Sequence, residues 1–348
     1  MRFSAITDDR TNSYSFSEKY AEKSLPLSPF MCNAENFGEE MTGKTIMTYQ
    51  TTLKREYNFR GKGLHSGKVA NMTLKPACAD SGIRFIRTDI GPDAVVEALA
   101  TNVSSTERST TLSQGSASIT TIEHLLSALT GLGVDNATIE IDNVEAPILD
   151  GSARPYVEAI TADGLETLDV PRKYIELDHV IEWKNPDTGA YLRIEPSDTP
   201  EINVEIDFNS KVIGIQKARW TPDMDYASEI SPCRTFCFFH EIEYLLAHNL
   251  IKGGDIDNAL VIVEHPVPEE RILHLGELIG KPGLKVRNGY LCESLHFKNE
   301  CARHKLLDLI GDLRLTGGFL KAKVTAYKSG HSINTKVARM VCEAISSK

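Results

Sequence analysis

The sequence predicts an α+β protein whose two halves have a similar build and face each other across a cleft. Its 348 residues suffice for about two domains with a buried core in each. Short alternating stretches, typical of strands, are mixed with a few stretches of helical period, without a regular succession of strand and helix. A helix with a histidine near its start, followed by glycine and an alternating strand, occurs once in each half. This repetition is the reason to expect two similar domains.

The composition excludes several classes of protein. With 41% hydrophobic and 25% charged residues, the chain is unlike a collagen, a coiled coil or a wholly disordered protein. No stretch approaches the roughly 18 uninterrupted apolar residues of a membrane span. The net charge of −10 argues against nucleic acid as a partner, since that would need a basic surface. The 7 cysteines are scattered and form no CxxC pair, which fits a reducing compartment. We therefore expect a cytoplasmic protein that is not an integral membrane protein.

Residues 1–46 are predicted to be a polar, disordered N-terminal extension. They are rich in Ser, Asn and Glu and lack the apolar core of a signal peptide. Patterned sequence begins near Met47. Either a flexible extension or a start codon assigned too far upstream, with Met47 as the working start, explains this change.

The first domain is expected over residues 47–171. Strands are predicted in TYQTTLKREYNF, MTLKPA, IRFIRTD and ATIEID, and a glycine-bounded turn, GLHSG, follows the first of them. A helix is predicted at about 121–130, because Gly131 and Gly133 can cap its end. Another helix follows the turn in EAPILDGSARPYVEAI. Residues 162–172 are expected to be a connector.

The second domain is expected over residues 172–348. Strands are predicted in YIELDHVIEW, YLRIEPS, INVEIDFN and FLKAKVTAY. An amphipathic helix is predicted over 238–248, and another begins near residue 300 in ECARHKLLDLIGDLRL. The segment 265–290 is rich in Pro, Gly and charge, so we expect a long loop there.

Three polar side chains form a row on the helix that begins near residue 300. His304 and Asp308 are one turn apart, so their side chains point the same way, and Asp312 continues the row. Imidazole nitrogen and carboxylate oxygen are suitable ligands for a divalent metal such as zinc. Taken alone, this spacing more often belongs to a surface pair that supports the helix.

The helix over 121–130 supplies groups that complete a metal site. Glu123 and His124 are neighbours and therefore lie about 100° apart around the helix, so one can bind metal while the other approaches a water molecule. A catalytic zinc ion takes three protein ligands and keeps one open position. His124, together with the histidine and aspartate of the other helix, reaches that count. Glu123 is then left as a general base.

A further histidine, His331, lies in the segment KSGHSIN, where a strand is expected to end. Gly330 before it permits close approach of the backbone, and loops at strand ends often carry catalytic groups. Lys321, Lys323 and Lys328 add positive charge nearby. A solvated strand edge that discourages aggregation explains the first two lysines equally well.

Six segments occur in an order that is typical of one enzyme family. They are GLHSG, TIEHLLSAL, APILDGSARPY, CRTFCFFHEIEYL, RHKLLDLIGD and AYKSGH. Together they closely resemble the zinc-dependent UDP-3-O-acyl-N-acetylglucosamine deacetylases of lipid A biosynthesis, over about residues 47–340. The resemblance implies an α+β fold of two domains with similar topology, each a sheet packed against helices. It also implies an active site in the cleft between them and one zinc ion per chain.

The resemblance also implies roles for individual residues. The zinc ligands fall on His124, His304 and Asp308, and the general base falls on Glu123. His331 matches a general acid or electrostatic stabiliser that is held by Asp312, and Thr235 matches a hydroxyl that stabilises the oxyanion. Lys305 matches a lysine near the substrate phosphates, and Lys328 is a further phosphate candidate.

The resemblance places the acyl chain and the uridine of the substrate in the second domain. An insert near 236–264 would form the acyl passage, with candidate lining residues Phe236, Phe238, Phe239, Ile242 and Leu246, some of which are expected to pack inward instead. Phe208 lies in VEIDFN, which resembles the uridine-contacting segment.

The reaction implied is hydrolysis of the N-acetyl group of UDP-3-O-acyl-N-acetylglucosamine to acetate and UDP-3-O-acyl-glucosamine by a monomer. His331 and Glu123 are alternative proton donors to the departing amine. Two other functions stay open at this point: a zinc deacetylase for another N-acetyl sugar, and a nucleotide-sugar binding protein without catalysis.

Overall fold

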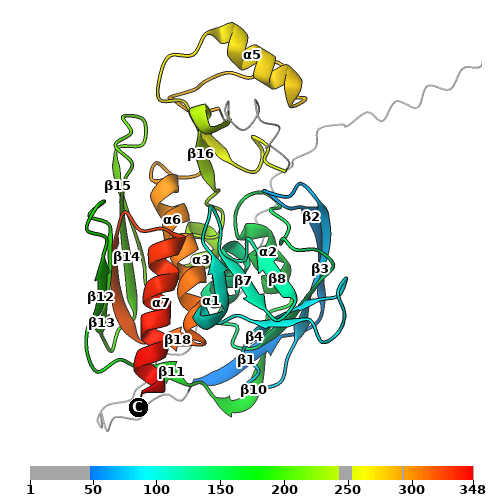
Figure 1. The fold of residues 1–348 in the computed structure, drawn as a ribbon, viewed down its shortest axis with the longest axis vertical. Helices are drawn as coiled ribbons and strands as arrows, with labels where there is room; N and C mark the ends of the chain where they lie inside the picture. The colour runs from blue at the N-terminus through cyan, green and yellow to red at the C-terminus, as the bar shows by residue number, and fades with distance from the viewer. Residues whose placement is uncertain (1–47, 243–252, 292–293, 348) are drawn as a thin grey trace, which may run out of the picture. The chain divides into compact units, whose positions relative to one another are not determined.

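Two five-stranded sheets form outer layers, and helices lie between them (Figure 1). The structure is a computed structural model that describes residues 48–242, 253–291 and 294–347. The extension predicted for residues 1–46 and the candidate lining residue Leu246 lie outside the described residues. None of the helices within the described ranges combines the length and apolar character that crossing a membrane requires.

The two sheets have the same strand order and the same strand directions. The first contains, from edge to edge, β2 (Tyr57–Lys62), β3 (Val69–Pro76), β9 (Ala137–Ile141), β4 (Ile83–Arg87) and β5 (Val95–Glu97). The second contains β12 (Ile181–Lys184), β13 (Tyr191–Pro196), β19 (Ala322–Tyr327), β14 (Glu201–Asp207) and β15 (Ile215–Trp220). In each sheet the strand that comes last in the chain is central. It runs antiparallel to one neighbour (β3 or β13) and parallel to the other (β4 or β14). The expectation of two similar halves is confirmed.

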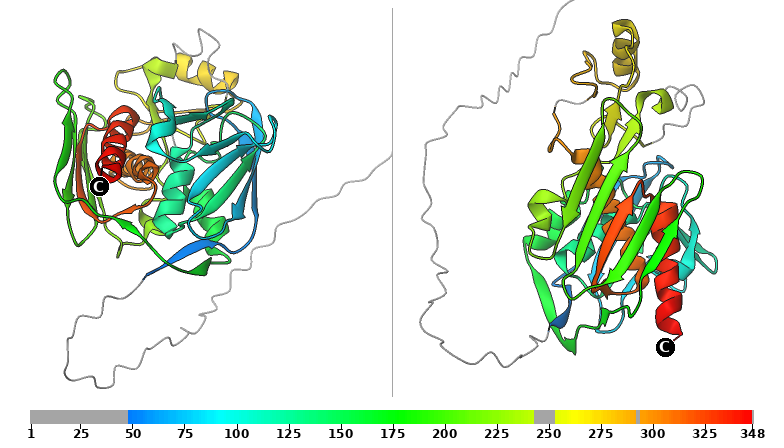
Figure 2. Two further views of the ribbon diagram at one scale, coloured as in Figure 1. Left: turned by 60° about the horizontal axis from the view of Figure 1, so that its bottom comes forward. Right: turned by 90° about the vertical axis from the view of Figure 1, so that its left-hand side faces the viewer.

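In the described part of the chain, four helices lie between the sheets (Figure 1). They are α1 (Glu123–Leu132), α2 (Arg154–Thr161), α6 (Glu300–Leu313) and α7 (His331–Ser346). Helix α6 packs against β14 and β15, and α7 packs against β12 and β13. Helices α1 and α6 pack against each other at the centre, which Figure 1 and the left view of Figure 2 both show. Helices α1 and α6 each lead into the central strand of a sheet, as the repeated helix–glycine–strand pattern predicts.

The apolar period of each central helix explains its burial. In α1, Leu125, Leu126 and Leu129 are fully buried, and Gly133 ends the helix in the left-handed region with a φ of 85°. In α6, the buried apolar residues include Leu306, Leu307, Leu309, Ile310 and Leu313. Both helices therefore contribute to the same apolar core.

Smaller elements complete the fold. They are β1 (Tyr49–Leu53) with β10 (Leu165–Pro171), β6 (Val103–Ser105) with β7 (Thr111–Gln114) and β8 (Ala117–Thr120), β11 (Tyr174–Ile175) with β18 (Phe319–Leu320), β16 (Phe236–Phe238) with β17 (Leu260–Ile262), and the helices α3 (Tyr226–Glu229) and α5 (Glu269–Leu278).

Two local predictions differ from the structure, and one helix was not predicted. The connector expected at 162–172 contains β10, which pairs with β1. The loop expected at 265–290 contains α5, because a single amphipathic helix fits within that charged stretch. Helix α7 was not predicted at all. Residues from 47 onward form one compact unit, and the boundary between 171 and 172 stays a prediction.

Candidate active site

The first turn of α1 packs directly against α6. The contact is close because Gly311 has no side chain: a Cβ atom at this position would lie 2.1 Å from the carbonyl oxygen of Glu123. That separation is far inside van der Waals contact, so only glycine permits this approach. The approach brings the residues at the start of α1 beside the polar row of α6.

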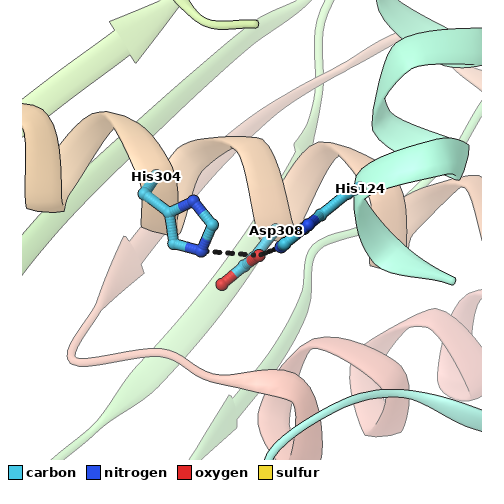
Figure 3. Close-up of side chains that lie close together, drawn as sticks. All are labelled: His124, His304 and Asp308. Carbon is cyan, nitrogen blue, oxygen red and sulfur yellow. Dashed lines mark ion pairs between the residues drawn. The ribbon is translucent and has the colours of Figure 1, made fainter. Parts of the chain in front are cut away.

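His124 from α1 and His304 and Asp308 from α6 lie together in the interior (Figure 3). The Nε2 atoms of His124 and His304 are 3.6 Å and 3.4 Å from Oδ1 of Asp308. One ligand atom of each residue lies within 4.8 Å of the others. The three side chains are at most 7% exposed. Two helices from different halves of the chain thus bring together the three predicted metal ligands.

The segment before β16 orients one of these imidazoles. Nδ1 of His304 donates to the carbonyl oxygen of Cys233 at 3.1 Å, which leaves Nε2 as the free ring nitrogen. Arg234, the next residue, donates through its Nε to Glu300 Oε1 at 2.9 Å, and the Glu300 side chain is fully buried. The first turn of α6 therefore anchors the backbone that holds the histidine.

The donor atoms fit a single cation. Oδ2 of Asp308 accepts a hydrogen bond from Lys305 Nζ at 2.8 Å, whereas Oδ1 is buried and accepts none from the described part of the chain. A buried carboxylate oxygen without a donor is costly, and a cation shared with the two imidazole nitrogens would remove that cost. Two histidines and one carboxylate match the ligand preference of zinc, with a position left open.

The charges of these groups suit metal binding. Burial lowers the pKa of His124 to about 3, with a further contribution from the neighbouring His304, and burial also lowers the pKa of His304. Burial alone would raise the pKa of Asp308, but His304 and Lys305 hold it well below its usual range. Neutral imidazoles and an ionised carboxylate are the forms that bind metal.

Two further predicted residues stand beside this cluster. His331 is the first residue of α7, and its Nδ1 donates to Oδ2 of Asp312 at 2.9 Å. Its Nε2 is 3.9 Å from Oε1 of Glu123 and 4.0 Å from Oδ2 of Asp308. The imidazole therefore lies among three carboxylates, with Asp312 fixing its orientation.

For both Glu123 and His331, burial and the neighbouring charges shift the pKa in opposite directions. Burial raises the pKa of Glu123 to about 7, although the positive charge of His331 opposes this shift. Burial alone would lower the pKa of His331, but the negative charges of Asp312 and Glu123 raise it to about 9. A base and an acid can therefore stand side by side in this arrangement.

Thr110, which precedes β7, forms hydrogen bonds with both Glu123 from the first half and Asp312 from the second half. Its backbone N–H donates to Oε2 of Glu123 at 3.1 Å, and its hydroxyl donates to Oδ1 of Asp312 at 2.6 Å. Asn334 on α7 donates to Oδ2 of Asp312 at 2.9 Å. Neither residue was predicted from the sequence. The run of hydroxyl residues in TERSTTLS is only a weak sequence signal for the Thr110 hydroxyl. Its backbone N–H leaves no signal in the sequence.

A cavity of about 460 Å³ opens onto the cluster. Its wall contains most of the predicted site residues, namely Glu123, His124, Thr235, Phe236, Ile242, His304, Lys305, Asp308 and His331. The backbone of Thr235 is held on both sides, since its N–H donates to Gly151 and its carbonyl accepts from Leu260. The hydroxyl predicted to meet an oxyanion thus belongs to a fixed part of the wall.

Two predicted substrate contacts, Phe208 and Lys328, lie outside this wall. The ring of Phe208 is 41% exposed and packs edge-on against Phe236, with centroids 5.4 Å apart. Lys328 pairs with Asp207 through Nζ and Oδ2 at 2.9 Å. The other predicted phosphate contact, Lys305, is on the wall but is bonded to Asp308. Roles in substrate binding stay predictions for all of them.

Known proteins match this chain along most of its length. The family model described as LpxC: UDP-3-O-acyl N-acetylglycosamine deacetylase matches residues 50–278 and 285–343. The UDP-3-O-acyl-N-acetylglucosamine deacetylase of Pseudomonas entomophila is 40% identical over 84% of this chain and 90% of its own length. The bifunctional enzymes LpxC/FabZ of Porphyromonas gingivalis and Bacteroides thetaiotaomicron are 42% and 38% identical over 86% of this chain.

The chain spans 65% of the length of each of these two bifunctional relatives, slightly less than two thirds. The relative from Pseudomonas entomophila, in contrast, is covered almost completely. The two ranges matched by the family model include His124, His304 and Asp308. This chain therefore belongs to the family of UDP-3-O-acyl N-acetylglycosamine deacetylases.

Proposed function

We propose that this protein hydrolyses the N-acetyl group of UDP-3-O-acyl-N-acetylglucosamine in a zinc-dependent reaction. The products are acetate and UDP-3-O-acyl-glucosamine, and the reaction is the committed step of lipid A biosynthesis. One observation carries the proposal: a buried set of metal-ligand side chains shares a cavity with Glu123 and His331. Family membership supports the choice of substrate. A cytoplasmic location and a monomeric state stay predictions from the sequence.

Zinc is the metal that the donor set favours. When bound, it lowers the pKa of water to about 7 and polarises the acetyl carbonyl. His124, His304 and Asp308 would hold it, with the Cys233 carbonyl fixing one imidazole and Lys305 compensating the carboxylate.

Glu123 is the proposed general base. Oε2 is engaged by the N–H of Thr110, so Oε1 is the oxygen available to accept a proton from the attacking water. The residue directly follows Ile122 at the start of α1 and is backed by α6, which limits its movement. A base fixed in this way needs no reorganisation when the water attacks.

His331 is the proposed group that stabilises the developing charge and donates a proton to the departing amine. Its Nδ1 is committed to Asp312, so Nε2 is the atom that faces the site. Thr235 is the proposed donor to the oxyanion, a contact that elsewhere contributes about 10²–10³ in kcat. An unchanged rate in His331→Ala would contradict the role of that imidazole.

The proposal is tested by measuring acetate release from UDP-3-O-acyl-N-acetylglucosamine, with and without a metal chelator and with zinc added back. We expect release that the chelator abolishes and zinc restores. A comparison with UDP-N-acetylglucosamine, which lacks the acyl chain, separates the alternatives. Equal turnover of the two compounds would favour a deacetylase for another N-acetyl sugar, and binding without any acetate release would favour a non-catalytic protein.

Thr110→Val is expected to lower kcat by about 10–100-fold with little change in KM. The valine has the same shape but cannot donate to Asp312, so that buried carboxylate loses one of its partners and His331 loses its fixed orientation. Thr110→Ser retains the hydroxyl and should restore most of the rate. Steady-state kinetics of both variants, beside the neighbouring Thr111→Val, would show this. Equal losses in Thr110→Ser and Thr110→Val would contradict the positioning role.

A further inference from the structure

The cavity of the candidate active site has an apolar part as well as a polar one. Six apolar residues of the wall come from one region of the chain, namely Ile242, Ile256, Ala259, Val261, Leu275 and Ile279. They belong to the insert around β16, β17 and α5, the last of which is drawn above β16 in Figure 1. The wall is continuous with the polar residues of α1, α6 and α7, so one ligand can touch both parts.

One face of α5 forms a side of this apolar part. Ile272 and Leu275 are 3% and 5% exposed, Gly276 is buried and Ile279 is half-buried, whereas Glu270 on the opposite side is exposed. These positions follow the period of a helix stripe. The stripe packs into a small apolar cluster that is separate from the main core of the protein, with members Phe239, Ile242, Val261, Val263 and Leu291.

The end of α5 is held against the cavity wall. The N–H of Lys281 donates to the carbonyl of Gly276 at 2.6 Å, and a Cβ atom on Gly276 would lie 2.5 Å from the Lys281 carbonyl oxygen. The side chain of Lys281 also forms an ion pair with Asp257, close to wall residue Ile256. These contacts fix the turn that carries Ile279.

The match to the family model is interrupted at this turn. The family model matches residues up to 278 and resumes at 285, so residues 279–284 lie outside the match. Ile279, the wall residue contributed by the turn, lies outside the match, whereas Leu275 lies within it.

We propose that α5 and the turn after it set the length of acyl chain that the enzyme accepts, with Leu275 and Ile279 forming the boundary of the acyl-binding part of the cavity. The inference rests on the proposed function, because it needs a 3-O-acyl chain in this cavity. Each methylene that still fits adds apolar burial, equivalent to about fourfold in affinity. A methylene beyond the boundary must displace packed side chains, which discriminates by about 10-fold or more.

The test compares kcat/KM over a series of UDP-3-O-acyl-N-acetylglucosamines with increasing even-numbered acyl chains, using the full chain loaded with zinc. Leu275→Trp is expected to move the optimum to shorter chains and to lower kcat/KM for the longest good substrate by about 10-fold or more. Leu275→Ala should move the optimum to longer chains. Ile279→Trp provides a second bulky variant at a less buried position, in case the first does not fold.

Ile272→Ala is the matched control. It removes a buried side chain from the same face of α5 and the same apolar cluster, but Ile272 is not part of the cavity wall. It should lower the stability of the insert without moving the chain-length optimum. Unchanged optima in all three cavity variants, or an equal shift in Ile272→Ala, would overturn the inference. Wild-type protein that deacetylates no member of the series would instead overturn the proposed function.

Discussion

Glu123→Gln is expected to lower kcat for acetate release by about 10²–10⁴-fold while the bound metal stays in place. Glutamine keeps the shape of the side chain and an oxygen that can accept the hydrogen bond from Thr110. It loses only the capacity to take a proton from water. The three proposed metal ligands His124, His304 and Asp308 are untouched, so metal content should equal that of the wild-type protein. Glu123→Ala should show a similar loss of rate with the metal retained.

The control for this variant is Glu241→Gln, the same chemical change in the same cavity wall. Glu241 accepts a hydrogen bond from the N–H of Phe238 and pairs with Arg108 at 3.6 Å, without contact to the metal ligands. We expect kcat to change little. Steady-state rates and elemental analysis of all three variants provide the comparison. Wild-type activity in Glu123→Gln would refute the assignment of the base.

The parts of the site that were predictable from the sequence are those with a local period. The row His304, Asp308 and Asp312 follows from helical geometry alone, because residues four apart share a face whatever the tertiary structure. The same holds for the adjacent pair Glu123 and His124. Their convergence was a hypothesis, since nothing local says that two helices from different halves will pack against each other.

The parts that escaped prediction depend on long-range contacts or on the backbone. Thr110 acts partly through a main-chain N–H, which every residue except proline possesses. Strand β10 appears as a strand because β1, more than a hundred residues earlier in the chain, pairs with it. Helix α5 is buried on one face by the apolar cluster of the insert. Its other face is charged, so the composition of residues 265–290 resembled that of a loop.

The similarity of the two sheets explains why the site lies where it does. Each half places a helix ahead of its central strand: α1 is followed by β9, and α6 is followed by β19 with only a short turn and β18 in between. Because the two halves face each other through these helices, both contribute side chains to one buried region between the sheets. The proposed metal site, with ligands from both helices, depends on the distance between α1 and α6, which the residues at their contact determine.

Gly311→Ala is therefore expected to abolish most activity, by about 100-fold or more, although the substituted residue touches no substrate. The added methyl group would occupy a position 2.1 Å from the backbone oxygen of Glu123, and backbone cannot rotate away as a side chain can. Helix α1 must then move away from α6 and carry His124 away from His304 and Asp308. We expect weaker zinc binding, partial recovery of the rate at high zinc concentration, and a lower Tm.

The sign of the change in stability of Gly311→Ala tests whether the contact between α1 and α6 is tight. In a helix with free space, replacing glycine by alanine stabilises by about 1 kcal/mol, whereas overpacking at a tight contact costs about 1–3 kcal/mol. Thermal unfolding of Gly311→Ala thus distinguishes the two by sign. Gly330→Ala is the control, because a Cβ atom there meets nothing within 4 Å although His331 is the next residue. A Gly311→Ala protein with raised Tm and wild-type zinc affinity would show that α1 and α6 do not need this contact to form the site.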